Sequence, residues 1–134
     1  YFKALLSSLM KYKSVDVNIQ IDNKHGYNGD LFSLSVGIGK YSGGGMMQTP
    51  DAVANDGLFD LTLIKDISKM KVIRSVNKLY NGDIHSVKET EAFRAQSLKI
   101  DSSAELFLEV DGESLGHAPF IFEIFHEQLQ VVVS

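Results

Sequence analysis

The alternation of hydrophobic and polar residues predicts a chain built mainly from β-strands. Over residues 15–21, valine and isoleucine alternate with polar side chains, which is typical of a strand buried on one face. The same period of two recurs over residues 32–38 and 58–64 and predicts two further strands. After a polar connection, the pattern favours four more strands, at residues 93–101, 105–111, 120–125 and 129–133.

Two segments show a helical period instead. Residues 2–12 place apolar side chains three and four positions apart, with lysines outside that spacing. Residues 68–80 do the same, with Ser68 suited to cap the start of a helix and Gly82 just past its end. The apolar stripe expected on this second helix consists of Met70, Ile73, Val76, Leu79 and Tyr80.

The connections between the predicted strands are mostly short, which favours antiparallel pairing. Residues 25–30 are expected to form the turn between the first two strands, with Asn28-Gly29 as the strongest turn signal. Residues 112–116 are expected to form another hairpin turn. Strands joined in this way, together with about two helices, predict a mainly β fold, either an antiparallel β-sandwich or a partly closed barrel. The length fits a single domain that spans residues 1–134.

Composition excludes several classes of protein. The net charge is −4, so no basic field would attract nucleic acid, and no nucleic-acid partner is expected. The absence of cysteine fits a reducing compartment, and we expect a cytoplasmic protein. No apolar run approaches the roughly 20 residues of a membrane span. The first residue is Tyr1 rather than methionine, which indicates a fragment of a longer protein.

One stretch, residues 36–61, combines unusual flexibility with acidic side chains. Five of the chain's 11 glycines fall within residues 37–45. Glycine permits positive φ and lets another backbone or a ligand approach where a Cβ would clash. The stretch is either a plain hairpin loop or a flexible loop that leads into Asp51 and the pair Asp56-Gly57. The second arrangement suits a site that faces a ligand or a cation.

Several catalytic motifs can be set aside. Residues 112–116 match the G-x-S-x-G nucleophile elbow, but that elbow requires a following helix, and a strand is predicted here. His126-Glu127 begins like a zinc-binding H-E-x-x-H, but Gln130 stands where the second histidine must be. The histidines show no other ligand spacing, and each is interpreted as a surface or capping residue.

Two acidic sites remain after these exclusions. Asp56-Gly57 is either a simple turn or a cation site, because an aspartate with neighbouring carbonyls suits magnesium or calcium. Asp111-Gly112-Glu113 lies at the end of a predicted strand. It is either a solvated hairpin or a proton acceptor with a positioning group at the rim of a cleft. Periodicity does not choose between these alternatives.

Five short segments form an ordered set along nearly the whole chain, and no single one is specific. They are Val36-Gly37 leading to Gly43-Gly44-Gly45, then Thr49-Pro50-Asp51-Ala52, Asp56-Gly57-Leu58-Phe59-Asp60, Leu79-Tyr80-Asn81-Gly82 and Val110-Asp111-Gly112-Glu113. With these gaps, the set resembles the C-terminal domain of the diacylglycerol kinase-like lipid kinases. That group includes bacterial lipid kinases and sphingosine kinases.

The resemblance implies a domain organisation. In that family the C-terminal β-sandwich, of the NAD kinase/diacylglycerol kinase-like fold, packs against an N-terminal nucleotide-binding domain, and the active cleft lies between them. The Gly-Gly-Asp-Gly-Thr nucleotide motif belongs to the N-terminal domain and is absent from this chain. We therefore expect ATP to bind mainly outside this chain, and we expect the fragment alone to be inactive. One departure is Ile38, where many family members have asparagine.

The resemblance also implies site residues. Bacterial members hold a structural magnesium ion in the turn before the third strand. Its ligands would be the carboxylate of Asp56 and the main-chain carbonyls of Val53 and Leu58. The proton acceptor proposed for the family falls on Glu113, with Asp111 beside it.

The full-length protein is thus expected to transfer the γ-phosphoryl group of ATP to a lipid hydroxyl, most simply that of diacylglycerol or a related alcohol. One alternative is an NAD kinase-like domain that acts on a soluble dinucleotide, and another is a non-catalytic β-sandwich binding module. The expected partners are the lipid substrate, the protein's own N-terminal domain and the inner face of a membrane, contacted peripherally. Exposed edge strands would also favour a homodimer of the isolated fragment.

Overall fold

The fold is mainly β and antiparallel, which confirms the predicted class. It was obtained as a computed structural model that describes residues 12–125. In chain order the elements are β1 Val15–Ile21, β2 Lys24–Gly37, η1 Gly43–Gly45, β3 Phe59–Lys65, α2 Lys69–Asn81, η2 Ile84–Ser86, β4 Thr90–Ala95, β5 Ser97–Ser102, β6 Phe107–Val110, β7 Glu113–His117 and β8 Phe120–Glu123.

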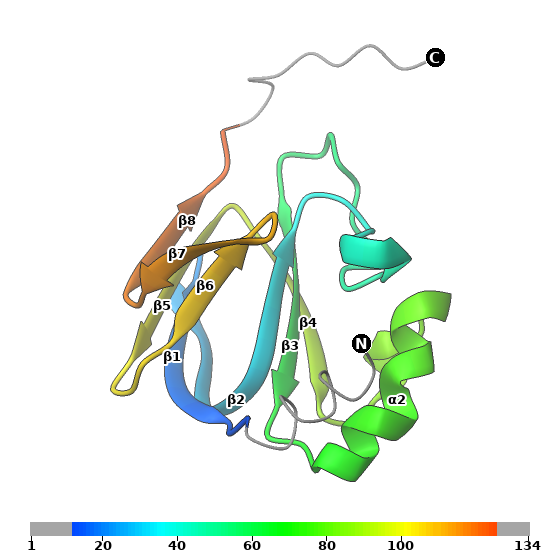
Figure 1. Cartoon of the computed structure of the whole chain (residues 1–134). Helices are drawn as coiled ribbons and strands as arrows, with labels where there is room; N and C mark the ends of the chain where they lie inside the picture. The colour runs from blue at the N-terminus through cyan, green and yellow to red at the C-terminus, as the bar shows by residue number, and fades with distance from the viewer. Residues whose placement is uncertain (1–11, 126–134) are drawn as a thin grey trace.

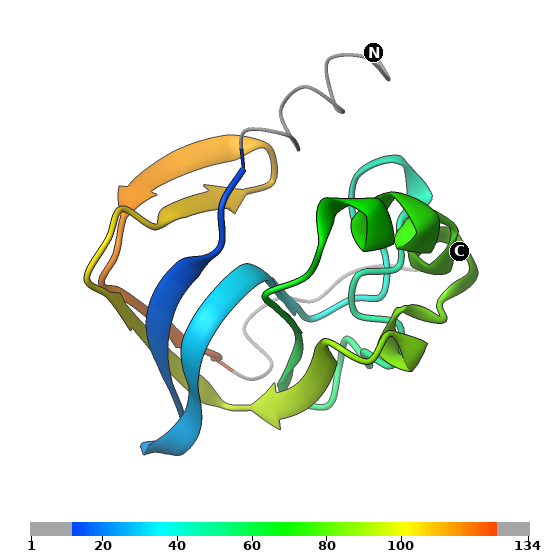
Figure 2. The same ribbon diagram turned by 90° about the horizontal axis from the view of Figure 1, so that it is seen from below.

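Six of the strands form one curved sheet in the order β4-β3-β2-β1-β5-β8 (Figure 1). The other two strands, β6 and β7, form a separate hairpin. Seen from the front and from below, this hairpin and helix α2 lie toward opposite sides of the molecule (Figure 2). The sheet ends at β4 and β8, so within residues 12–125 it does not close into a barrel.

The main hydrophobic core follows from the alternation in the strands. Val17 and Ile19 on β1 point inward and are each 1% exposed, while their polar neighbours along the strand face outward. Partly buried aromatic residues of β8 pack against the same core. The buried members of this core are Val17, Ile19, Leu31, Leu61, Leu63, Ala95, Leu98 and Ile100.

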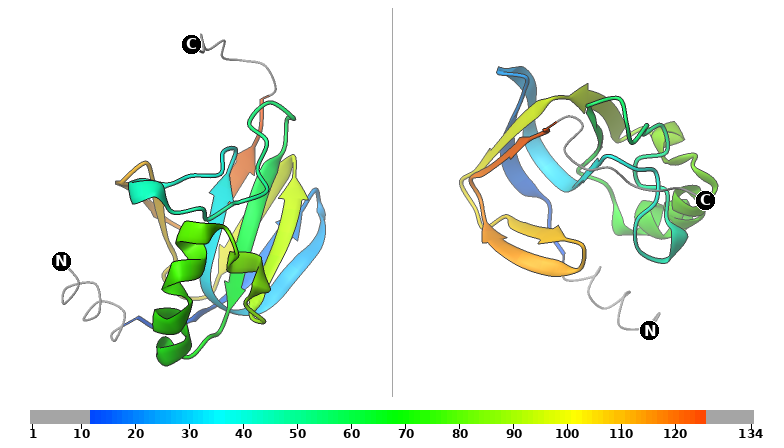
Figure 3. Two further views of the ribbon diagram at one scale, coloured as in Figure 1. Left: turned by 90° about the vertical axis from the view of Figure 1, so that its right-hand side faces the viewer. Right: turned by 90° about the horizontal axis from the view of Figure 1, so that it is seen from above.

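A second, smaller core lies between the sheet and helix α2. Strand β3 is buried on both faces, because Leu61 and Leu63 belong to the main core whereas Ile64 packs against the second one. Figure 3 shows α2 against one side of the sheet, with the segment around Gly43–Gly45 above it. The second core consists of Ile67, Ile84 and Val87, with Phe32, Ile64, Val72 and Leu79 packed against them.

Helix α2 begins and ends as predicted. Ser68 precedes it in an extended conformation, although its side chain makes no capping hydrogen bond. Gly82 ends it at φ 77°, a left-handed conformation that glycine adopts without steric cost. The predicted apolar stripe is partly wrong, because Met70, Val76 and Tyr80 are exposed. Leu79 does pack against the second core as predicted, together with Val72, which the predicted stripe did not include. No residue of the helix is fully buried.

The turn predicted at residues 25–30 is wrong. The chain reverses at Asp22 and Asn23, whose φ angles of 48° and 60° form a two-residue hairpin turn. Strand β2 then runs through Asn28 and Gly29 without interruption. The Asn-Gly signal competed with an equally good turn signal upstream, and the shorter loop between the two strands prevailed.

The segment at residues 93–101 is two strands rather than the predicted one. It breaks at Gln96, between β4 and β5. The Asp22 carboxylate accepts hydrogen bonds from the backbone N–H groups of Gln96 and Ser97, each at 2.9 Å. A side chain distant in sequence therefore satisfies the backbone groups at the break.

Strand β7 occupies the place where residues 112–116 were expected to form a hairpin turn. The turn lies earlier, at Asp111 and Gly112, with φ angles of 51° and 87°. Val110 and Glu113 then pair directly across β6 and β7. The short stretch that makes β7 contains a glycine and few β-branched residues, so its pattern did not indicate a strand.

The helix predicted at residues 2–12 and the strand predicted at residues 129–133 lie outside the described residues, apart from Tyr12. His126 and Glu127 lie outside them as well. Between residues 12 and 125, no helix has the length and apolar character needed to cross a membrane.

Candidate functional site

A cleft of about 780 Å³ brings together two of the features that stood out in the sequence. One wall is the end of β2 with the glycine-rich loop that follows it. The other wall is strand β6 and the turn after it. Apolar residues form part of the lining: Val36, Ile38 and Met46 on the first wall, Leu108 and Val110 on the second, and Phe122 from β8.

Asp111 and Glu113 occupy different places relative to this cleft. Asp111 lies in the β6–β7 turn and lines the cleft together with Gly112. Glu113 is the first residue of β7, beside the turn, and is not part of the lining. Both carboxylates are exposed, so each is available to a ligand or to another domain at the rim of the cleft.

The glycine-rich loop is folded back on itself. Ser42 and Met46 exchange two backbone hydrogen bonds, of 2.8 and 3.1 Å, around the short turn η1. Gly44 and Gly45 within it have φ angles of 69° and 84°, which explains why glycine is found there. The N–H of Met47 then bonds to the carbonyl of Leu79, so the loop is attached to the last turn of α2.

Thr49 fixes the beginning of the loop against its end. Its hydroxyl donates a hydrogen bond of 2.8 Å to the carbonyl of Gly39. A Cβ at Gly37 would lie 2.6 Å from this same hydroxyl oxygen. Gly37 is therefore required because Thr49 fills the space that any side chain would need, and together they shape one wall of the cleft.

A second pocket, next to the cleft, lies at the start of β3. This pocket, of about 270 Å³, is lined by Asp60 and Arg94, and it shares Thr49 with the cleft. Asp60 pairs with Arg94 across β3 and β4, so the two charges meet on one face of the sheet. The Nε of Arg94 lies 3.2 Å from the Asp60 carboxylate, and its terminal Nη2 contacts the carboxylate of Asp56.

Burial makes the ionisation of Asp60 unusual. Only 8% of its side chain is exposed, and one carboxylate oxygen, Oδ2, is buried without a hydrogen-bond partner among the described residues. Burial raises the pKa of Asp60 above its ordinary value of 3.8, Arg94 lowers it, and the nearby carboxylate of Asp56 raises it. Arg94 is the group that keeps the ionised form of Asp60 tolerable.

His85 connects three elements in this region. Its Nδ1 lies 3.0 Å from the Asp51 carboxylate, and its Nε2 lies 3.0 Å from the buried hydroxyl of Thr62. These contacts join η2 to β3 and to the segment after the glycine-rich loop. His85 is therefore neither the surface nor the capping residue that sequence analysis predicted, and no spacing in the sequence indicated its partners.

The three residues expected to bind magnesium all belong to one turn, and every ligand atom that they offer is an oxygen. The Asp56 carboxylate accepts a hydrogen bond of 3.0 Å from the N–H of Leu58, and the carbonyl of Val53 accepts one of 3.3 Å from the N–H of Asp56. Such oxygen ligands fit a hard cation, but Arg94 competes for the second oxygen of Asp56. Within residues 12–125, no three His, Cys, Asp or Glu side chains are grouped to hold a metal ion. A magnesium site would therefore depend on one carboxylate, carbonyls and water.

Comparison with known proteins identifies the family. The chain belongs to the family described as the YegS C-terminal NAD kinase beta sandwich-like domain, whose model matches residues 1–133. This confirms the resemblance to the C-terminal domains of lipid kinases.

Similar proteins carry kinase names. A relative from Shewanella frigidimarina named "Probable lipid kinase YegS-like" is 30% identical over 128 residues. The match covers 96% of this chain and 41% of the relative. The diacylglycerol kinase of Bacillus subtilis is 26% identical over 133 residues, covering 99% of this chain and 44% of its own. The chain thus spans less than half the length of these relatives.

A solved structure shows the same fold. A diacylglycerol kinase from Bacillus anthracis str. Sterne superposes with a TM-score of 0.69 and 23% identity, over 92% of this chain and 44% of the other.

Replacing Arg94 with alanine should make stability depend more strongly on pH than it does in the wild type. Without the guanidinium, the pKa of Asp60 should rise further, and the folded state then binds protons more tightly than the unfolded state. Stability must therefore fall as the pH rises from 3.8 through the raised pKa. An unpaired buried polar group costs about 1–3 kcal/mol, and we expect Arg94→Ala to lose this much at pH 7 and distinctly less at pH 4.

Urea unfolding of the full-length protein at the two pH values measures this difference. Arg74→Ala, at an exposed position on α2, is the matched control and should change stability little at either pH. An equal loss for Arg94→Ala at both pH values would show that Asp60 does not depend on Arg94.

Proposed function

We propose that this chain is the substrate-side domain of an ATP-dependent kinase that phosphorylates a lipid hydroxyl, such as that of diacylglycerol. The observation that supports this most strongly is the cleft itself. It joins a lining that is partly apolar, which suits the hydrocarbon part of a lipid, with the Asp111-Gly112 turn at its rim. The apolar part of the lining supports a lipid acceptor. The kinase names of the relatives point in the same direction.

The chemistry that we propose is an in-line phosphoryl transfer. The lipid hydroxyl oxygen forms a bond to the γ-phosphorus, the bond from that phosphorus to the β–γ bridging oxygen breaks, and ADP leaves. The hydroxyl proton goes to the carboxylate of Glu113, and Asp111 positions the acceptor. The exposure of both side chains at the β6–β7 turn is compatible with this role, since the nucleotide would arrive from outside this chain. An alternative assigns the base to the other domain and leaves Glu113 to orient the acceptor.

We also propose a structural magnesium ion in the turn before β3, held by Asp56 and the carbonyls of Val53 and Leu58. Such an ion supplies positive charge that orders the turn. The protein's own part is to release one oxygen of Asp56 from Arg94 and to present the two carbonyls. Arg94 would then retain Asp60 as its partner.

Asp56→Ala should abolish any stabilisation by magnesium. The carboxylate is the only charged ligand in the proposed set, and carbonyls and water alone compete poorly with the hydration of the ion. Thermal unfolding of the full-length protein with and without millimolar magnesium tests this. Asp51→Ala, which removes an exposed acid nearby, is the control and should keep the wild-type response. The same magnesium response in Asp56→Ala as in the wild type would mean that the turn binds no ion.

Glu113→Gln should lower kcat by roughly 10²–10⁴-fold, because the amide keeps the shape of the side chain but cannot accept the proton. Stability should change little, since the side chain is exposed. Steady-state kinetics of the full-length protein with diacylglycerol and ATP gives the value, and Glu123→Gln on β8 is the matched control. A raised KM with unchanged kcat would remove the proton-acceptor role from Glu113 and favour the alternative.

A further inference from the structure

His85 joins the segment at residues 48–52, which follows the glycine-rich loop, to strand β3. Its Nδ1 lies 3.0 Å from the Asp51 carboxylate, and its Nε2 lies 3.0 Å from the hydroxyl of Thr62. An ionised carboxylate only accepts hydrogen bonds, so Nδ1 carries a proton and donates it toward Asp51. In the neutral imidazole Nε2 is then an acceptor, and the Thr62 hydroxyl donates to it. His85 thus satisfies a buried hydroxyl with one nitrogen and holds an exposed carboxylate with the other.

The segment held in this way forms part of the cleft wall. Gln48 and Thr49 line the cleft, and Thr49 is buried. Thr49 bonds through its hydroxyl to the carbonyl of Gly39, and its own carbonyl accepts a hydrogen bond of 3.1 Å from the N–H of Ala52. Asp51 therefore lies within a tight turn that begins at Thr49. A displacement of Asp51 is transmitted through this turn to Thr49 and from there to Gly39 at the start of the loop.

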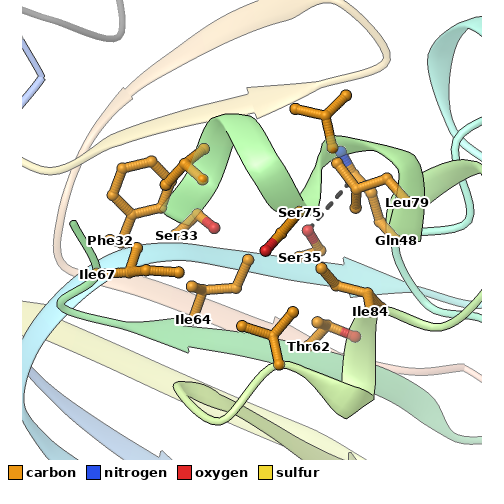
Figure 4. Close-up of a pocket in the computed structure, with 13 residues that line it drawn as sticks. Phe32, Ser33, Ser35, Gln48, Thr62, Ile64, Ile67, Ser75, Leu79 and Ile84 are labelled. Atoms are coloured by element: carbon orange, nitrogen blue, oxygen red, sulfur yellow. Dashed lines mark hydrogen bonds between the residues drawn. The ribbon is translucent and has the colours of Figure 1, made fainter. Parts of the chain in front are cut away.

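The base from which His85 projects is packed against the sheet. Ile84, the residue before it, is buried in the second core, and Ile84 and Thr62 line the same cavity of about 130 Å³ beneath α2 (Figure 4). A second side-chain hydrogen bond holds the start of the segment, because the hydroxyl of Ser35 donates to the side-chain oxygen of Gln48 at 3.1 Å (Figure 4). The wall is thus attached to β2 at one end and to η2 at the other.

We propose that His85 is a positioning residue for the acceptor lipid, because its hold on Asp51 keeps this wall of the cleft in the shape that binds the lipid. His85 does not line the cleft, so it acts through Asp51 and Thr49 rather than by touching the substrate. This inference rests on the proposed function for its substrate. Loss of the contact with Asp51 should weaken binding of the lipid, whereas kcat and the KM for ATP should change little.

Two substitutions separate the two contacts of His85. In His85→Gln the amide reaches the position of Nε2, so it keeps a partner for Thr62 but loses Asp51. In His85→Asn the shorter amide lies where Nδ1 was, so it keeps Asp51 but leaves the buried Thr62 hydroxyl without a partner. In the full-length protein, we expect His85→Gln to raise the KM for dioctanoylglycerol about tenfold, an effect that the loss of one charge-assisted hydrogen bond can produce. His85→Asn should keep the wild-type KM and lower stability in urea unfolding.

Further variants control for misfolding and for an indirect effect. Asp51→Ala removes the other side of the contact and should raise the KM as His85→Gln does, and it decides the matter if His85→Gln does not fold. The double variant should be no worse than either single one, since both remove the same interaction. His25→Gln, at an exposed position on β2 outside the cleft, is the matched control and should keep the wild-type KM. An unchanged KM in His85→Gln and Asp51→Ala, or an equal rise in His85→Gln and His85→Asn, would overturn the inference.

Hydrogen exchange separates failure of the inference from failure of the proposed function, because it needs no turnover. Exchange of the backbone amides at residues 37–49 in the full-length protein, followed by mass spectrometry, should be about tenfold faster in His85→Gln and Asp51→Ala than in the wild type or in His25→Gln. If the wild type does not phosphorylate dioctanoylglycerol, the proposed function fails. Faster exchange in the two variants would still support the positioning of the loop by His85, and exchange at the wild-type rate would overturn it.

Discussion

The contact between Thr49 and Gly37 determines the shape of the functional face. Strands β2 and β3 pair up to Gly37 and Asp60, and there β2 ends and the glycine-rich loop begins. Because Thr49 returns to within 2.6 Å of the position where a Cβ at Gly37 would lie, the loop is held close against the end of the strand. This single close approach forms one wall of the cleft. It also places the chain after Thr49 beside the acidic turn.

At the start of β3, on the side where it pairs with β4, the charged side chains are arranged around Arg94. Arg94 contacts Asp56 and Asp60, and it lies on β4 directly across from Asp60. A buried carboxylate without its cation is costly, so the stability of the start of β3 depends on how Arg94 is shared between Asp60 and Asp56. A ligand that competes with Arg94 for Asp56 therefore changes the surroundings of Asp60. A magnesium ion in the turn would be such a competitor. The proposed ion and the cross-strand ion pair are thus linked through one side chain.

The sequence predicted the strands that have a clear period of two, such as β1 and β3, and it predicted helix α2 with its glycine end. It did not predict β7, whose residues have no such period, or the hairpin turn at Asp22 and Asn23. The nearness of the glycine-rich loop to Asp111 was not predicted, because periodicity does not show which loops lie side by side. The partners of Arg94 depend on strand register, and those of His85 depend on how a loop folds. Neither can be read from the local alternation of hydrophobic and polar residues.

The central claim is that the cleft between the glycine-rich loop and the β6–β7 turn binds the lipid. Photo-crosslinking tests it most directly, with the full-length protein, a short-chain diacylglycerol that carries a diazirine next to its glycerol, and mapping of the labelled peptides. The account predicts that label falls on residues 37–46 and 108–112, the two walls of the cleft, and that excess dioctanoylglycerol removes it. Label confined to other parts of the chain, or label on these walls that excess lipid leaves unchanged, would contradict the account.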